Sequence, residues 1–216
     1  MRFPWPLAPA LVLTGCGLAT HVRPVPPGAL QVEAAVGGPV AVIGAPVPLP
    51  LSTAGARYGV LPRWDIGAHV HLTTLLALGT PGLDVETNVL ALEESGPIPA
   101  VSFTARGYAF TDLRSGVQLD WDLGVTVSRT FSERWLVFFN LVRQQQYDGA
   151  GPWSVAIGGR LSFTPAPAGL QLELRVFDLF QPTAGSSIPW VSPFSHGALG
   201  VVLGADWEVV RLRTAP

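Results

Sequence analysis

The chain has 216 residues, of which 48% are hydrophobic and only 13% are charged, with 24 Gly and 21 Pro. A composition this apolar excludes a disordered chain, because disordered segments are poor in apolar residues and rich in charge. The basic residues are all Arg and the formal net charge is -2, which gives no electrostatic basis for a nucleic-acid partner. A single Cys excludes an internal disulfide framework and a Cys-rich metal site.

The first residues have the layout of a secretory signal peptide. One basic residue, Arg2, precedes the apolar stretch Leu7–Leu13, which is too short to span a bilayer as a helix. The stretch runs into Leu13-Thr14-Gly15-Cys16, which resembles the lipobox of bacterial lipoproteins. The resemblance implies that Cys16 becomes the lipidated N-terminus, carrying palmitate or a similar acyl chain. Because Gly17 and not Asp follows the Cys, the same resemblance implies sorting to the outer membrane.

The sequence predicts four successive parts. Residues 1–15 form the lipoprotein signal peptide, and residues 16–28 form the lipidated N-terminus with a Pro-rich tether, in which we expect His21 to be solvated. A β-barrel follows over residues 29–210, and residues 211–216 form a polar C-terminal tail.

Beyond the tether, apolar and polar residues alternate with a period of two. The segment Leu170–Val176 is an example, and such alternation indicates a β-strand with one apolar and one polar face. We find no convincing helical periodicity and no run of 18 apolar residues. Ten strands are predicted, at residues 29–38, 52–61, 63–74, 82–92, 98–108, 116–128, 133–144, 153–163, 168–178 and 196–209.

These strands are typical of a membrane barrel in length and in connection. A tilted membrane strand takes about 9 to 11 residues. The connections after even-numbered strands are short and those after odd-numbered strands are mostly longer, the longest being Leu179–Ser195. The chain therefore resembles porin-like outer-membrane barrels of Gram-negative bacteria, with both termini in the periplasm. The predicted fold class is all-β, a transmembrane antiparallel β-barrel of about ten strands.

Alternation alone does not tell which face meets lipid, because a soluble ligand-carrying barrel has the same period with the faces reversed. Aromatic residues on the apolar face gather at the end with short turns, as in the girdle of a membrane interface. The predicted girdle consists of Tyr58, Trp64, Trp135, Phe163 and Trp207. This clustering favours an outward apolar face.

The polar face carries nearly all the strand charges. A basic residue on the lipid face at the bilayer midplane costs about 2–4 kcal/mol, so the confinement of charge to the other face is informative. The predicted lumenal charge network consists of Glu33, Arg57, Asp65, Arg106, Asp120, Asp122, Arg160, Glu173, Arg175 and Asp206. Glycines on the same face are expected to leave room for these side chains inside a narrow barrel.

The last strand bears on the expected partners. Its segment Gly204–Val209 resembles the C-terminal signal that the barrel-assembly machinery recognises, although a polar tail follows in place of the usual terminal Phe. The resemblances imply that the chain meets outer-membrane lipid, the barrel-assembly machinery and the lipoprotein-sorting machinery. The oligomeric state stays open.

The candidate chemistry lies on the third and fourth strands. If Thr73 faces Gly82, then His71 lies opposite Asp84 and, further along the same strands, His69 lies opposite Glu86. A His beside a carboxylate is suited to a proton relay. The arrangement is loosely similar to omptins, outer-membrane proteases with Asp and His at the barrel mouth. The alternative is that these pairs simply neutralise one another, because buried charges must be paired.

Two other features of the sequence give weaker indications of function. His69 and His71, with Asp65 on the same strand, have ligand types that suit a transition metal, but two His without a third strong ligand do not predict a site. We therefore predict no metal and no cofactor. The apolar loop Leu179–Ser195 is suited to a lid, to contact with lipid headgroups or to a partner, and we favour a lid.

Together these patterns predict a lipid-anchored outer-membrane barrel with a lumen largely filled by side chains. Its expected role is structural or surface interaction, without enzymatic activity and with at most a narrow channel. One alternative is an outer-membrane hydrolase, a protease or lipid-modifying enzyme, that uses His71 and Asp84. The other is a lipid-anchored soluble barrel that carries an apolar ligand.

Overall fold

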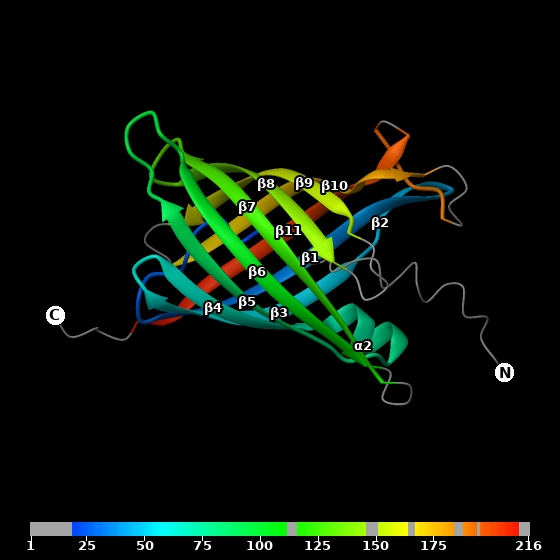
Figure 1. Ribbon diagram of the computed structural model, residues 1–216, viewed down its shortest axis with the longest axis horizontal. Helices are drawn as coiled ribbons and strands as arrows, with labels where there is room; N and C mark the ends of the chain where they lie inside the picture. Colours follow the sequence, from blue (N-terminus) through cyan, green and yellow to red (C-terminus); the bar gives the residue numbers. More distant parts are fainter. Residues whose placement is uncertain are drawn as a thin grey trace.

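Ten antiparallel strands close into a barrel in the computed structural model (Figure 1). The structure describes residues 19–111, 116–145, 151–163, 167–183, 188–193 and 195–211. The wall consists of β1 (Ala29–Ile43), β3 (Leu51–Leu61), β4 (Trp64–His71), β5 (Gly82–Leu92), β6 (Ala100–Thr111), β7 (Val117–Thr130), β8 (Trp135–Gln145), β9 (Trp153–Phe163), β10 (Ala168–Pro182) and β11 (His196–Arg211). Each strand pairs with the next, and β11 returns to pair with β1.

The ten predicted strands are the ten strands of this ring, so the predicted fold class is confirmed. The largest differences between the predicted and the observed strands lie at strand ends. There β1 continues past residue 38 to Ile43, and β10 continues past residue 178 to Pro182. We call the end that holds the turn 62–63, the start of β1 and the end of β11 the short-turn end. It lies on the left in Figure 1, opposite the long-loop end.

Two short elements lie at the long-loop end (Figure 1). The strand β2 (Ala45–Pro48) folds back on the end of β1 as a hairpin. The helix α2 (Leu72–Leu78) follows β4 directly and ends at Gly79, which adopts the left-handed conformation that terminates a helix. The prediction that the third strand runs to residue 74 is therefore wrong, because leucines at helical spacing replace the alternation after His71. Among the described residues, no helix is long and apolar enough to cross a bilayer.

The wall is apolar outside and polar inside. In β10, for example, Leu172 is 51% exposed whereas the next residue, Glu173, is fully buried. Polar residues dominate the buried positions of β4, β5, β7 and β10, while Val, Leu, Ile and Phe dominate the exposed positions. A soluble barrel with an apolar ligand has the reverse arrangement, so this distribution supports the membrane barrel against that alternative.

The five residues of the predicted girdle all lie near the short-turn end, close to strand starts or strand ends. Each is between 37% and 52% exposed, so each side chain presents much of its surface to the surroundings. Their contact with a membrane interface stays a prediction.

Part of the long loop between β10 and β11 is paired with the wall. The Val42 amide donates to the Pro189 carbonyl at 2.7 Å, and the Val191 amide donates to the Val40 carbonyl at 2.9 Å. The described residues 188–193 therefore extend the sheet beside β1 and do not form the predicted lid.

We expect a charge on the outward face to destabilise the barrel according to its depth. Leu172→Arg should lower the free energy of unfolding in lipid vesicles by about 2–4 kcal/mol, because this exposed residue lies midway along the part of β10 that pairs with both neighbouring strands. The control Val209→Arg, near the end of β11, should cost only about 0–1 kcal/mol. Guanidinium titration of the refolded variants measures both. Equal losses would contradict an outward face that meets lipid.

Candidate functional site

The lumen contains the segment that precedes β1. We call residues 19–28 the lumenal segment; it enters at Gly28, at the short-turn end, and extends inward to Ala19, which lies beside Gly204 of β11. His21 is only 6% exposed, so the expectation that it is solvated is wrong. The physical reason is that the wall offers unpaired polar groups to which this Pro-rich segment hydrogen-bonds.

The inner end of the lumenal segment is held by β10. The Glu173 carboxylate accepts hydrogen bonds from the amide and, at 2.9 Å, from the hydroxyl of Thr20. The Gln171 side chain donates to the Thr20 carbonyl at 2.8 Å, and Arg175 donates to the Thr20 hydroxyl at 3.0 Å. One threonine thereby binds three neighbouring polar side chains of the wall.

The rest of the segment is bonded to other strands of the ring. The Val22 carbonyl accepts a hydrogen bond from Ser102 of β6 at 3.0 Å, and the Val25 amide donates to Asp65 of β4 at 2.6 Å. Near the rim the backbone passes so close to β3 that a Cβ at Gly59 would lie 2.0 Å from the Pro26 carbonyl oxygen. Only glycine fits there without displacing the segment.

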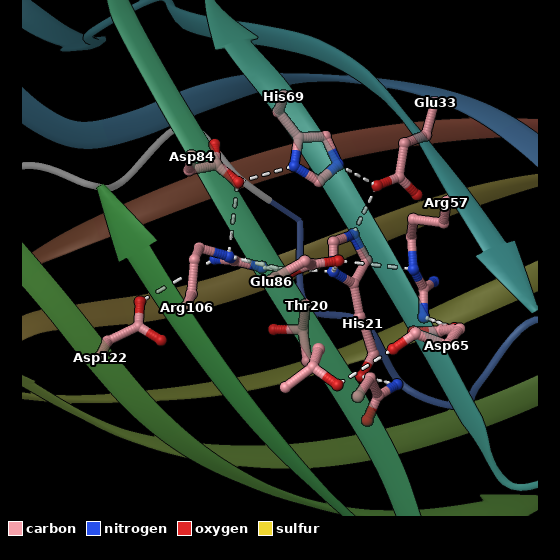
Figure 2. A network of polar contacts seen from close by, with 12 residues as sticks. Thr20, His21, Glu33, Arg57, Asp65, His69, Asp84, Glu86, Arg106 and Asp122 are labelled. Carbon is pink, nitrogen blue, oxygen red and sulfur yellow. Dashed lines mark hydrogen bonds and ion pairs between the residues drawn. The ribbon is translucent and has the colours of Figure 1, made fainter. Parts of the chain in front are cut away.

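A dense set of charged groups surrounds His21 in the middle of the lumen (Figure 2). Alternation along β1, β3, β4, β5, β6 and β7 turns these side chains inward. We call this set the lumenal cluster: His21, Glu33, Arg57, Asp65, His69, His71, Asp84, Glu86, Arg106 and Asp122.

Both inner imidazoles of the cluster lie between carboxylates. His69 Nδ1 is 2.7 Å from Asp84 Oδ1, and its Nε2 contacts Glu33. His21 Nε2 is 2.8 Å from the same Glu33 oxygen, and its Nδ1 contacts Glu86. Both rings are therefore fixed at their two nitrogen atoms (Figure 2).

Two arginines link the acids of the cluster to one another. Arg106 donates from Nε to Glu86 at 2.9 Å, and its guanidinium lies 3.9 Å from Asp122. Arg57 pairs with Asp65, and its Nε lies 3.4 Å from Glu86. The cluster is thus one connected network and not a row of separate ion pairs.

The predicted pairing of His71 with Asp84 and of His69 with Glu86 is wrong by two residues. In the register of β4 and β5, His69 faces Asp84 and Gly67 faces Glu86. The tight closure that the prediction assumed does not form, because α2 occupies the residues after His71. His71 Nε2 still reaches Asp84 diagonally, at 3.1 Å.

The other residues of the predicted charge network also face the lumen. Arg160 pairs with Asp206 at 2.7 Å, towards the short-turn end. Arg175 pairs with Glu173 at 2.8 Å, and Asp120 is buried on β7. What the prediction missed is His21, because a single His in an aperiodic Pro-rich stretch carries no signal of inward orientation.

In the part of the chain that the structure describes, a larger and a smaller cavity lie beside the segment. The larger, about 380 Å³, lies towards the short-turn end and is bordered by Arg160, Asp206 and, at its inner end, by His21, Glu33 and His69. The smaller, about 40 Å³, lies between Thr20 and the β6 to β9 side of the wall. Only the larger has room for a small solute.

The comparisons with known proteins concern the fold alone. No protein-family model matches the chain, and no curated protein matches it. An outer-membrane channel from Pseudomonas putida F1 is 8% identical with a TM-score of 0.43, over 88% of this chain and 98% of that chain. A de novo designed transmembrane β-barrel is 13% identical with a TM-score of 0.36, over 86% of this chain and 99% of that one. OmpT, an outer-membrane protein of Vibrio cholerae, is 13% identical with a TM-score of 0.33, over 83% of this chain and 60% of that one.

A further contact of the segment lies outside the membrane-spanning strands. Arg23 donates to Glu94, in the turn between β5 and β6, at 2.5 Å. This hydrogen bond, together with one from the Thr130 hydroxyl, lowers the pKa of the Glu94 carboxyl from 4.5 to about 2. Because the pKa is lowered by folding, the stabilisation is present above pH 4.5 and is lost as the pH falls towards 2.

We expect Arg23→Ala to return the pKa of Glu94 towards 4.5, because the largest cause of its depression is removed. Carbon NMR titration of the Glu94 carboxyl in micelles measures the change. Arg129→Ala is the matched control, since Arg129 binds the Gly96 and Pro97 carbonyls of the same turn. An unchanged Glu94 titration in Arg23→Ala would show that the segment does not reach this turn.

Proposed function

We propose that the chain is an outer-membrane β-barrel of a Gram-negative bacterium whose lumen is closed by its own residues 19–28. In this proposal the barrel has a structural or surface-interaction role and conducts solutes poorly or not at all. The observation that carries the proposal is the set of hydrogen bonds from the lumenal segment to β4, β6 and β10, on different sides of the ring.

The dimensions of the barrel favour a closed lumen. Barrel diameter grows with strand number, and ten strands enclose little more than their inward side chains. Here the same space also holds ten residues of backbone and the lumenal cluster. On the β6 to β9 side of the segment the remaining cavity is about 40 Å³, room for only a few water molecules, whereas the cavity of about 380 Å³ extends towards the short-turn end.

The outward face supports the membrane location. A closed barrel satisfies all its backbone hydrogen bonds within the wall, which is the condition for strands to span a bilayer. Aliphatic side chains cover the middle of the strands, and the aromatic residues of the predicted girdle lie near one end. This is the arrangement of outer-membrane barrels.

The geometry favours this role over the hydrolase alternative. A general base needs a nitrogen that faces the substrate, yet both nitrogens of His69 already contact carboxylates. His71 is buried, with its ring packed 4.9 Å from that of Phe110. The omptin-like hypothesis requires a His at the mouth of the barrel, and neither imidazole faces the opening at the long-loop end.

Cys16 lies outside the described residues, and its lipidation is also part of the proposal. In the lipidated protein the lumenal segment takes a position different from the one described above. Ala19 lies beside Gly204 of β11. From Gly204 the strand continues to Arg211 at the short-turn end, which is about 18 Å away along the barrel axis. The chain from Cys16 to Ala19 spans at most about 11 Å. A lipid in the inner leaflet therefore requires Ala19 to leave its position in the lumen.

We expect the refolded, unlipidated protein to show little or no steady conductance in planar bilayers. Gly59→Ala should raise the conductance, because its Cβ displaces the Pro26 carbonyl and with it the segment. Gly124→Ala is the matched control, since a Cβ at this inward position meets side chains only at 3.5 Å or more. A steady large conductance of the wild-type protein would overturn the closed lumen.

Fractionation tests the membrane location separately. We expect Cys16→Ala to remain in detergent-extractable outer membrane and to show heat-modifiable gel mobility, because the strands hold it there without a lipid. Release of this variant as a soluble protein would contradict the transmembrane barrel. Mass spectrometry of the native N-terminus tests lipidation itself, and an unmodified or uncleaved Cys16 would remove the lipid from the proposal.

A further inference from the structure

Two histidines and two glutamates meet in the lumenal cluster although they are distant in sequence. The ligand atoms of His21, Glu33, His69 and Glu86 all lie within 4.8 Å of one another. The Nε2 atoms of both imidazoles contact the same Glu33 oxygen, and the two rings are stacked with their centroids 5.5 Å apart (Figure 2). Ligands of a tetrahedral metal ion lie about 3.3 Å apart, so these groups are close enough to share one ion.

We propose that His21 Nε2, His69 Nε2 and the Glu33 carboxylate bind one divalent transition-metal ion of the Zn²⁺ class. Two imidazole nitrogens and one carboxylate are a ligand set that suits such ions. The predicted candidates His71 and Asp65 are not part of the site, because His71 turns towards Asp84 and Asp65 pairs with Arg57.

The remaining nitrogen of each imidazole has a carboxylate partner. His69 Nδ1 lies 2.7 Å from Asp84, and His21 Nδ1 contacts Glu86. Metal-binding histidines usually donate their second N–H to a carboxylate, which fixes the tautomer and the orientation of the ring. Asp84 and Glu86 are therefore positioning residues of the site. The two Nε2 atoms, which both contact the same Glu33 oxygen, are the nitrogens available to exchange their protons for a cation.

The charge of the cluster accommodates a divalent cation in exchange for two protons. Its carboxylates are Glu33, Asp65, Asp84, Glu86 and Asp122, and its guanidiniums are Arg57 and Arg106. In the geometry described, both nitrogens of His21 and of His69 face carboxylates, so each ring donates from both and is a cation, which leaves one negative charge on these groups. A divalent ion that takes the place of the two Nε2 protons supplies the same two positive charges and leaves each imidazole neutral, with its Nδ1 hydrogen directed at a carboxylate.

The ion has a route to this position. The cavity of about 380 Å³ borders His21, Glu33 and His69 and extends to residues of the short-turn end. An open coordination position towards that cavity leaves room for water or another small ligand. Because His21 belongs to the lumenal segment and the other ligands belong to the wall, the ion would also cross-link the two.

The test is metal binding by tag-free, refolded protein in detergent. We expect about one Zn²⁺ per chain by elemental analysis, and a visible absorption band when Co²⁺ replaces it. His69→Ala and His21→Ala should lower the affinity by more than the roughly 10–100-fold that loss of an outer-shell partner costs. His21→Ala lies outside the strands, so it tests the site without altering the wall.

His71→Ala is the matched control, because it removes a neighbouring imidazole that contacts the same Asp84 without being a ligand. It should bind metal within a few-fold of wild type, and heat-modifiable mobility verifies that each variant is a folded barrel. A folded wild-type protein that binds no Zn²⁺, or an equal loss in His71→Ala and His69→Ala, would overturn the proposal. The readout is independent of conductance, so failure of the metal site and failure of the closed lumen remain distinguishable.

Discussion

The structure depends on the need to pair polar groups inside a ring that is too narrow to hydrate them freely. A strand that presents apolar residues to lipid must turn its other residues inward, and in this chain many of those are charged. The wall alone does not satisfy them all. Glu173 is fully buried and receives hydrogen bonds from Thr20, and Asp65 receives one from the Val25 amide. The lumenal segment and the wall therefore stabilise each other, because each supplies partners that the other lacks.

Space is the second requirement, and glycine meets it at the positions of closest approach. A Cβ at Gly55 would lie 2.2 Å from the His69 ring, and one at Gly59 would lie 2.0 Å from the Pro26 carbonyl oxygen. The first glycine leaves room for an imidazole of the cluster, and the second leaves room for the segment to enter. The inward glycines that the sequence places among charged residues thus create the volume in which the network forms.

The sequence predicts the positions of the strands well, and the register between neighbouring strands less well. Alternation is a local property, so it reveals both the strand and the face of residues such as Leu172 and Glu173. Register is not local: the pairing of His69 with Asp84 depends on how the chain closes through α2, where leucines at helical spacing break the alternation. The burial of His21 depends on contacts with strands far along the chain, and no periodic pattern in its own segment indicates them.

The absence of Lys from the chain acquires a physical meaning in the lumen. A Lys side chain ends in a single point charge, whereas the planar guanidinium of Arg presents several donors in different directions. Arg106 uses this geometry to lie between Glu86 and Asp122, and Arg57 lies between Asp65 and Glu86. Acids on different strands are thereby connected through a small number of cations. A point charge at either position would reach fewer of these acids at once, and a buried acid that loses a cation is costly in a lumen too narrow to supply water.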